Sequence, residues 1–367
     1  MLIFHAAAPD GAGPLVRALA EARRSLAERQ RIAFLAAGGD EAEIVAGPPD
    51  GRSFGERLGA AMRARTGSPG GAVAGGAIVL GSGSIPLAQA ADLRRFVEVA
   101  AGPAGHALAN NRYSADVVAV SRAADLAELP PLPVDNALPR WLEERAGVAV
   151  ADLRSRWRLG VDIDTPLDLI VLGDRHGTAP LIGERLAALS EVLTNRRAEL
   201  LVAGRVSSAT LRWLESGAAC RVRALVEERG LRAATGLAQS GATTGSRPPR
   251  SVLGELLDRD GPESLAGIVA RLADAALIDT RVLLAHRHGA DESAPASAPS
   301  SSGPWPAAED RFASDLSLPE SIADPWLRAL TASAATSPVD HPILLGGHTL
   351  VNGGLRLVAQ RARAGAR

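Results

Sequence analysis

The beginning of the chain restricts the fold, because apolar runs there alternate with an amphipathic segment. Leu2–Ala8 is predicted to be a short buried strand. Leu15–Gln30 repeats apolar residues at helical spacing, and Arg31–Ala37 is again apolar enough for a strand. A strand, a helix and a second strand in this order are typical of α/β proteins, so we expect a mostly parallel, Rossmann-like sheet.

The second half of the chain starts an α/β pattern of its own. Ala198–Ala203 and Cys220–Val226 are predicted strands, and Ser207–Gly217 between them is a predicted helix. The chain has 367 residues, whereas single cores stop growing near about 250–300 residues. We therefore expect two α/β domains, residues 1–172 and 173–367, with a disordered Ser/Pro/Ala-rich loop around residues 288–308.

Composition excludes several kinds of site and partner. The net charge is −1 and aromatic residues make up 3%, so no nucleic-acid partner is expected. The single cysteine, Cys220, excludes an internal disulfide framework. Lysine is absent, so phosphate must be bound by arginine or by backbone N–H groups. No apolar run reaches ~18 residues and no basic leader is visible, so we expect a cytoplasmic protein without a membrane partner.

Arg158–Leu172, with the sequence RLGVDIDTPLDLIVL, contains the most specific acidic pattern in the chain. Leu159–Ile163 is predicted to end a strand that Thr165-Pro166 interrupts. Residues two apart in a strand point to the same face, so Asp162 and Asp164 would share a cleft and hold a divalent cation. The alternative is that Asp164 caps a helix that begins with the proline.

The D-x-D-T-P-x-D-L pattern of Asp162–Leu169 resembles the end of the nucleotidyltransferase domain in the glycosyltransferase-A-like fold. Molybdenum-cofactor guanylyltransferase and 2-phospho-lactate guanylyltransferase are members of that family. The resemblance covers residues 1–172. It implies a site at which Mg²⁺ is held on nucleotide phosphates, with Asp162 and Asp164 as the catalytic and metal-binding residues.

The chain departs from that family at two loops. The turn Pro9–Pro14 has only two glycines, so it is either a phosphate loop or a plain connection. Ala77–Leu87 is a predicted strand and loop, but Gly83 stands where the family has a metal-binding aspartate. Backbone N–H groups of this loop are still candidates for binding an anion, and the candidates are Ser82, Gly83 and Ser84.

Polar residues gather before the predicted strand within Ala107–Val120. They are either substrate contacts or an interlocked structural turn. A second polar pair opens a predicted helix, where N-A-L resembles a substrate-facing helix start and a cap by Asp135 is the alternative. The substrate-binding candidates from these two segments are Asn110, Asn111, Arg112, Asp116, Asp135 and Asn136.

Near the C-terminus, paired glycines flank His348 within His341–Leu355. Three interpretations remain open: a metal site with His341, a bulged hairpin with a solvated histidine, and an acid/base or phosphate contact. The candidates of the second half are Glu227, Arg229, Asp310, Asp315, His348 and Asn352.

The expected function is transfer of a nucleoside monophosphate from a nucleoside triphosphate to a small phosphorylated acceptor, with release of pyrophosphate. Mg²⁺ would be the cofactor, and Arg17 or Arg112 would replace the missing lysine. The alternative is a degenerate, non-catalytic domain that binds a nucleotide or sugar nucleotide, with any activity in the C-terminal half. The sequence makes no prediction of oligomeric state.

Overall fold

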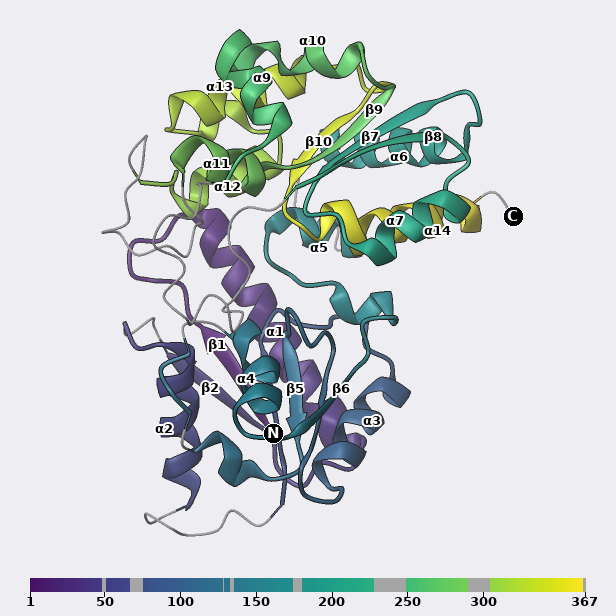
Figure 1. Ribbon diagram of the computed structural model, residues 1–367. Coiled ribbons are helices and arrows are strands. Elements are labelled where there is room, and N and C mark those ends of the chain that lie inside the picture. Colours follow the sequence, from purple (N-terminus) through teal and green to yellow (C-terminus); the bar gives the residue numbers. More distant parts are fainter. Residues whose placement is uncertain are drawn as a thin grey trace. The chain divides into compact units, whose positions relative to one another are not determined.

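The computed structural model describes residues 1–47, 51–66, 75–127, 129–132, 135–173, 180–227, 249–289 and 304–365. These residues form two compact units, each built around its own sheet (Figure 1). Unit 1 comprises Met1–Ala12 and Arg17–Asp162, and unit 2 comprises Gly13–Val16 and the described residues from Ile163 onward. Both units have the α/β architecture that the sequence predicts.

Unit 1 contains a six-stranded sheet in the order β2-β1-β3-β5-β4-β6. Strand β5 is antiparallel to both of its neighbours, and the remaining pairs are parallel. The carboxyl ends of β1, β3, β4 and β6 therefore lie at one edge, where the antiparallel strand begins. The strands are β1 (Leu2–Ala6), β2 (Glu43–Gly47), β3 (Ala77–Gly81), β4 (His106–Ala109), β5 (Val117–Val120) and β6 (Ala149–Asp152).

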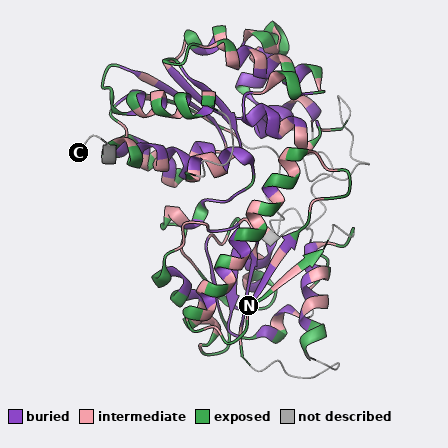
Figure 2. Ribbon diagram, turned by 180° about the vertical axis from the view of Figure 1, so that it is seen from behind, coloured by how far each residue is buried: buried purple, intermediate pink, exposed green. Residues whose placement is uncertain are grey.

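Helices cover both faces of this sheet because successive side chains of a strand point to opposite sides. Leu2 packs with the face covered by α2 and α4, whereas Ile3 packs with the face covered by α1 and α3. Figure 2 shows the interior strands as buried and edge strand β2 as more exposed. The helices are α1 (Pro14–Ala36), α2 (Phe54–Thr66), α3 (Ala90–Ala100) and α4 (Leu138–Glu144), with short 3₁₀ turns at Ala123–Leu126, Asp135–Ala137 and Trp157–Gly160.

Unit 2 contains a four-stranded, all-parallel sheet in the order β10-β9-β7-β8. The chain moves outward from β7 to β8 and then returns to the other side of β7. The strand order therefore reverses between β7 and β9, which is where open α/β sheets bind their ligands. The strands are β7 (Glu199–Gly204), β8 (Arg221–Val226), β9 (Ala275–Asp279) and β10 (Ile343–Gly346).

The helices of unit 2 form two layers around its sheet (Figure 1). One layer packs on Leu200 and Val202 and consists of α5 (Pro166–Leu172), α6 (Pro180–Thr194), α7 (Ser208–Gly217) and α14 (Leu355–Gly365). The other layer packs on Leu201 and Ala203. It contains α9 (Val252–Asp260), α10 (Leu265–Ala270), α11 (Thr280–His288), α12 (Ala308–Asp315) and α13 (Pro325–Thr336), with 3₁₀ turns at Pro262–Ser264 and Pro319–Ser321.

Two of the predicted strands are helical in the structure. Arg31–Ala37, predicted as a strand, lies largely in α1, because the buried positions Leu26, Gln30 and Phe34 continue its helical spacing. The sequence of Ile278–Ala285 is apolar enough to predict a strand as well. Only its beginning belongs to β9, because the Asp279 side chain accepts from the N–H of Arg281 and starts α11 there.

The hairpin interpretation of His341–Leu355 is wrong. The segment supplies β10, which pairs in parallel with β9, and then a single π turn at Leu350–Gly354 that leads into α14. The N–H of Gly354 donates to the Thr349 carbonyl five residues earlier, at 2.8 Å. The disordered loop expected around residues 288–308 lies mostly outside the described residues.

Leu159–Ile163 is not a strand end either. The segment begins within the 3₁₀ turn Trp157–Gly160, and the helix after it is capped by Thr165 rather than by Asp164. The Thr165 hydroxyl accepts from the N–H of Asp168, whose carboxylate accepts from the N–H of Thr165 in return. Within the described part of the chain, no helix is long and apolar enough to cross a membrane.

A fully buried arginine joins three elements of unit 2. Arg185 of α6 donates to the carbonyls of Ala334, Ala335 and Ser337 at the end of α13, at 2.9–3.1 Å. Its other terminal nitrogen donates to the Ile343 carbonyl at the start of β10, at 2.9 Å. The guanidinium thus satisfies carbonyls that the end of a helix otherwise leaves without partners.

We expect Arg185→Ala to lower the unfolding free energy by about 3–5 kcal/mol, because it leaves several buried carbonyls without donors. Urea unfolding followed by circular dichroism measures this loss. Arg221→Ala is the control, since Arg221 forms an exposed ion pair with Glu199 and should cost less than about 1 kcal/mol. Equal losses in the two variants would show that the buried guanidinium has no special role.

Candidate functional site

The carboxyl edge of the unit 2 sheet gathers charged groups from four separate segments. Arg205 follows β7, Asp279 ends β9, and His348 follows β10. Asp164 comes from the segment that caps α5. Because parallel strands end at the same edge, residues far apart in the sequence meet there.

Asp164 and His348 form the most accessible pair of this cluster. The Oδ2 atom of Asp164 lies 3.7 Å from Nδ1 of His348, and the two side chains are 49% and 29% exposed. The supporting loops are also close, since a Cβ atom on Gly347 would lie 3.8 Å from Cγ2 of Thr165. Both groups can therefore be reached by a ligand while their backbones are held by packing.

The loop that carries His348 is fixed by Asn352. The side-chain amide of Asn352 donates to the carbonyls of His348 and Arg205, at 2.8 and 2.9 Å. Its oxygen accepts from the N–H of Ser207 and from the Thr210 hydroxyl, at 2.8 and 3.0 Å. Asn352, a predicted site residue, thus has its hydrogen-bonding capacity used in joining the loops after β7 and β10.

Asp168 is a buried carboxyl group behind Asp164. Its Oδ2 accepts from the N–H groups of Asp164 and Thr165, at 2.9 and 2.7 Å, while Oδ1 is buried without a hydrogen-bond partner among the described residues. Burial, followed by the negative charge of Asp164, raises the pKa of Asp168 from 3.8 to about 7, although the two N–H groups and His348 oppose the shift.

Two ion pairs hold the ends of β9 and α12. Arg205 donates from Nε to Oδ2 of Asp279 at 2.7 Å, and Arg281 forms a two-pronged pair with Asp315 that includes an Nη2–Oδ2 contact of 2.7 Å. Burial alone would raise the pKa of Asp279, but Arg205 outweighs it and holds that pKa below its usual value. Gly204, at φ +126°, permits this approach, because a Cβ there would lie 2.3 Å from Cβ of Asp279.

The charges of the cluster favour a cation over an anion. Asp164, Asp279 and Asp315 bring three carboxylates, whereas Arg205 and Arg281 bring two guanidinium groups. Two of the carboxylates are paired with these arginines, and the carboxylate of Asp164 faces His348. Two ligand atoms that share a metal ion at ~2.1 Å lie roughly 3.4 Å apart in a tetrahedral site, which is close to the observed 3.7 Å.

The donor set bears on which metal fits. Asp164 and His348 offer one oxygen and one nitrogen ligand in a group that is suited to hold an ion. Imidazole is a preferred ligand of zinc and other transition metals, whereas Mg²⁺ prefers oxygen alone. Asp162, the predicted partner of Asp164, is the last residue of unit 1, and the expected strand that would align the two acids is absent.

The carboxyl edge of the unit 1 sheet holds the other predicted residues. Ser82 and Ser84 are buried in the loop after β3, next to the point where the strand order reverses between β1 and β3. His5 of β1, which the sequence analysis missed, lies with Nδ1 3.1 Å from the Ser82 hydroxyl. Burial, and then Arg24 and Arg23, lower the pKa of His5 and favour its neutral form.

Backbone strain occurs in the same loop. Ile85 has φ +44°, although a β-branched side chain strongly disfavours this region. The side-chain amide nitrogen of Gln30 in α1 donates a hydrogen bond to the Ser84 carbonyl. The side-chain oxygen of Gln30 is buried without a partner among the described residues. Gly83 lies between Ser82 and Ser84 in this loop.

The polar segment after β4 is an interlocked turn. Asn110 donates to Asp116 Oδ2 and to the Leu159 carbonyl, both at 2.8 Å, and accepts from the N–H groups of Asp116 and Val117. The N–H of Tyr113 donates to the Asn111 side chain at 3.1 Å. These bonds are those expected of a structural turn. The Asp116 carbonyl accepts from the N–H of Gly81 at 3.3 Å, so Asp116 lies at the same edge as the β3 loop.

Three of the remaining unit 1 candidates also have protein partners. Arg112 pairs with Glu143, and Asn136 Oδ1 accepts from the Ser114 hydroxyl at 3.2 Å. Arg17 donates to the Ala12 carbonyl. Asp135 begins a 3₁₀ turn, and its side chain lies outside the described part of the structure.

Three candidates of the second half are caps or lie outside the described residues. Glu227 accepts from the Ser251 hydroxyl and the Val252 N–H at the start of α9, at 2.7 and 2.6 Å. Asp310 accepts from the N–H groups of Ala323 and Asp324, at 3.0 and 2.9 Å. Arg229 is not among the described residues.

The first turn of α1 directly follows Pro9–Pro14, the segment predicted as a phosphate loop or a connection, and two of its amides are engaged. The N–H groups of Leu15 and Val16 donate to the Glu309 carboxylate at 2.9 and 3.1 Å. A side-chain anion thus binds where a phosphate would bind at the start of this helix.

Comparison with known proteins returned no match among family models, curated proteins or solved structures.

The pKa of Asp168 predicts a pH-dependent stability. The folded state binds the proton more tightly than the unfolded chain, so stability is lost as pH rises from about 4 to about 7. A shift from 3.8 to about 7 corresponds to ~4 kcal/mol. Asp168→Asn cannot ionise and keeps an oxygen for the two N–H groups, so it should avoid this loss.

Unfolding free energies of both proteins between pH 4.5 and 7.5 measure this effect. The unfolding free energy of Asp168→Asn, relative to that of the unmodified chain, should increase with pH. Asp340→Asn, at an exposed position of the same unit, controls for the loss of one carboxylate. An advantage that is constant across this range would contradict the assignment.

Proposed function

We propose that the reactive centre of this protein is the carboxyl edge of the unit 2 sheet, and that it acts on a phosphate-containing small molecule with a divalent cation. The observation that carries the proposal is the Asp164–His348 pair, 3.7 Å apart and accessible. A cation held by this pair would offset the repulsion between the carboxylate of Asp164 and a phosphate.

Asp164 and His348 would hold the cation, and Asp162, two residues earlier, is the further oxygen donor that the sequence predicts. A bound cation polarises phosphate oxygens and neutralises the charge that develops on them. Arg205 remains paired with Asp279, and this ion pair keeps the carboxylate ionised and aligned at the end of β9. The buried Asp168 holds the backbone of Asp164 in place through its two hydrogen bonds.

The mixed donor set favours Mn²⁺ or Zn²⁺ over Mg²⁺. We expect Mn²⁺ at a hundred times its dissociation constant to raise the unfolding free energy by ~2.7 kcal/mol. His348→Ala and Asp164→Asn should each abolish this increase in unfolding free energy. Isothermal titration with Mn²⁺ measures the loss of binding directly and needs no activity assay.

His341→Ala is the matched control, since this exposed histidine lies just before β10 and should leave Mn²⁺ binding unchanged. Equal binding by the His348 variant and the original chain would overturn the proposal. Retained binding in Asp162→Asn with loss in Asp164→Asn would limit the site to the unit 2 residues.

A second candidate function is nucleotidyl transfer at the unit 1 edge, as the resemblance implies. It is favoured by the strained loop with Ser82 and Ser84 at the point where strand order reverses. The N–H groups of Ser82 and Ser84 donate to the carbonyls of Phe4 and Gly81, at 2.9 and 3.1 Å. A nucleotide phosphate would therefore bind this loop through the N–H of Gly83, with Asp116 and Asn110 bordering it. The alternative of nucleotide binding without transfer uses the same groups.

A panel of nucleoside triphosphates, each with and without Mg²⁺, tests this second function by thermal unfolding. We expect a base-selective increase of ~2.7 kcal/mol at a hundredfold excess over the dissociation constant. The Mg²⁺-dependent part should disappear in Asp162→Ala. No increase with any nucleotide would exclude this function and would leave the Mn²⁺ result unaffected.

A further inference from the structure

A pocket lies at the amino edge of the unit 2 sheet, away from the carboxyl-edge cluster. It has a volume of about 290 Å³ and is bordered by the ends of α6 and α7 and by α14. This volume is at the small end of the range for ligand pockets, so it suits a compact molecule. The lining residues are Leu193, Thr194, Arg196, Gly217, Ala219, Ala359 and Arg363.

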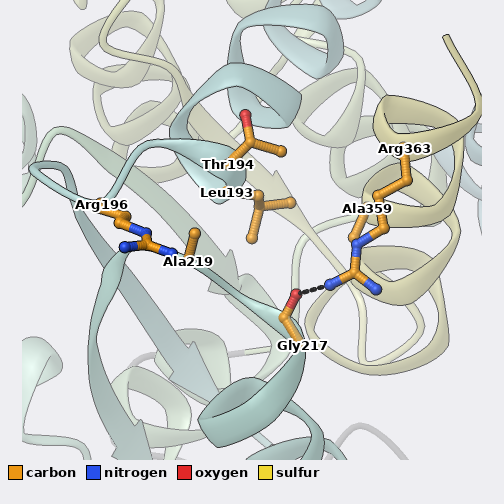
Figure 3. Close-up of a pocket in the computed structure, with 7 residues that line it drawn as sticks. All are labelled: Leu193, Thr194, Arg196, Gly217, Ala219, Ala359 and Arg363. Carbon is orange, nitrogen blue, oxygen red and sulfur yellow. Dashed lines mark hydrogen bonds between the residues drawn. The ribbon is translucent and has the colours of Figure 1, made fainter. Parts of the chain in front are cut away.

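Two arginines dominate the charge of this pocket. In Figure 3, Arg196 and Arg363 lie on opposite sides of the set of lining residues, with Leu193 and Ala219 between them. No lining residue is acidic. Arg363 donates one N–H to the Gly217 carbonyl, and Arg196 has no hydrogen bond or ion pair with the described residues. Guanidinium groups placed in this way favour a carboxylate or phosphate.

The floor of the pocket is apolar. Leu193 and Ala359 belong to the core layer beneath it, and Ala219 leads into β8. The Thr194 hydroxyl donates to the Glu191 carbonyl at 3.0 Å, so its hydrogen is already used in a bond within α6. The carbonyls at the nearby helix ends are also engaged, because Ala219 N–H donates to Leu193 at 2.8 Å and Arg363 donates to Gly217. These bonds reduce the partial negative charge that a helix end presents to an anion.

We infer that this pocket binds a compact organic anion. Its carboxylate or phosphate lies between Arg196 and Arg363, and its short apolar body rests on Leu193, Ala219 and Ala359. The inference is independent of the proposed function, since it uses the opposite edge of the sheet and none of the same residues.

Phenyl phosphate is the probe, measured by isothermal titration against the full chain. It should bind with a dissociation constant of about 1 mM or tighter. Inorganic phosphate, which lacks the apolar body, and benzyl alcohol, which lacks the charge, should each bind at least about tenfold more weakly. Absence of phenyl phosphate binding, or equal binding of the three probes, would overturn the inference.

Variants assign the binding to this pocket. Arg196→Gln and Arg363→Gln should each weaken phenyl phosphate about tenfold or more. Arg197→Gln, the neighbouring exposed arginine outside the lining, and His348→Ala at the other edge should leave it unchanged. Arg196→Gln is decisive, because it removes no internal hydrogen bond. Binding that survives this variant, or that is lost in His348→Ala, would place the anion elsewhere.

Discussion

The position of β10 in unit 2 depends on one buried guanidinium. Arg185 holds the carbonyls at the end of α13 and the first carbonyl of β10, and it has no carboxylate partner in any contact described for it. Burial lowers its pKa, so the hydrogen bonds must offset the cost of removing its charge from water. Since His348 follows β10 directly, the geometry of the proposed centre depends on a residue at the far end of that strand.

The groups at the carboxyl edge serve the fold and the candidate chemistry together. Asp279 starts α11, pairs with Arg205 and lies against Gly204, while Asn352 joins two loops with one side chain. Such groups cannot move without breaking local structure, so the accessible pair Asp164 and His348 is presented on a rigid frame. A preorganised frame lowers the cost of binding a cation, because little conformational freedom is lost.

The sequence predicted the local features whose causes are themselves local. Apolar runs predict most strands. Ser53 with Glu56 three residues later predicts a capping box, and Ser207 or Ser208 is the predicted cap of the helix before Gly217. The box and the Ser207 cap are both present. Strands β4 and β6 were missed because each has four residues and little periodicity. Strand β2 was missed because the second strand was expected at Arg31–Ala37, and no parallel strand was predicted at β10. The cluster could not be assembled beforehand, since Asp164, Arg205 and His348 meet only through the strand order β10-β9-β7. Asp279 was not selected because its segment was predicted to continue as a strand.

The π turn at Leu350–Gly354 sets the rotational phase between Asn352 and the core face of α14. An α-helix advances about 100° per residue, so the extra residue in this turn displaces everything before it by that angle. The turn thereby lets Leu355 face the core while Asn352 faces the loops after β7 and β10. Shortening the turn by one residue would convert it to regular α-helix. Asn352 and the loop of His348 would then rotate about the helix axis and move away from Arg205. The one extra residue of this turn therefore determines the orientation of the loops that Asn352 joins at the carboxyl edge.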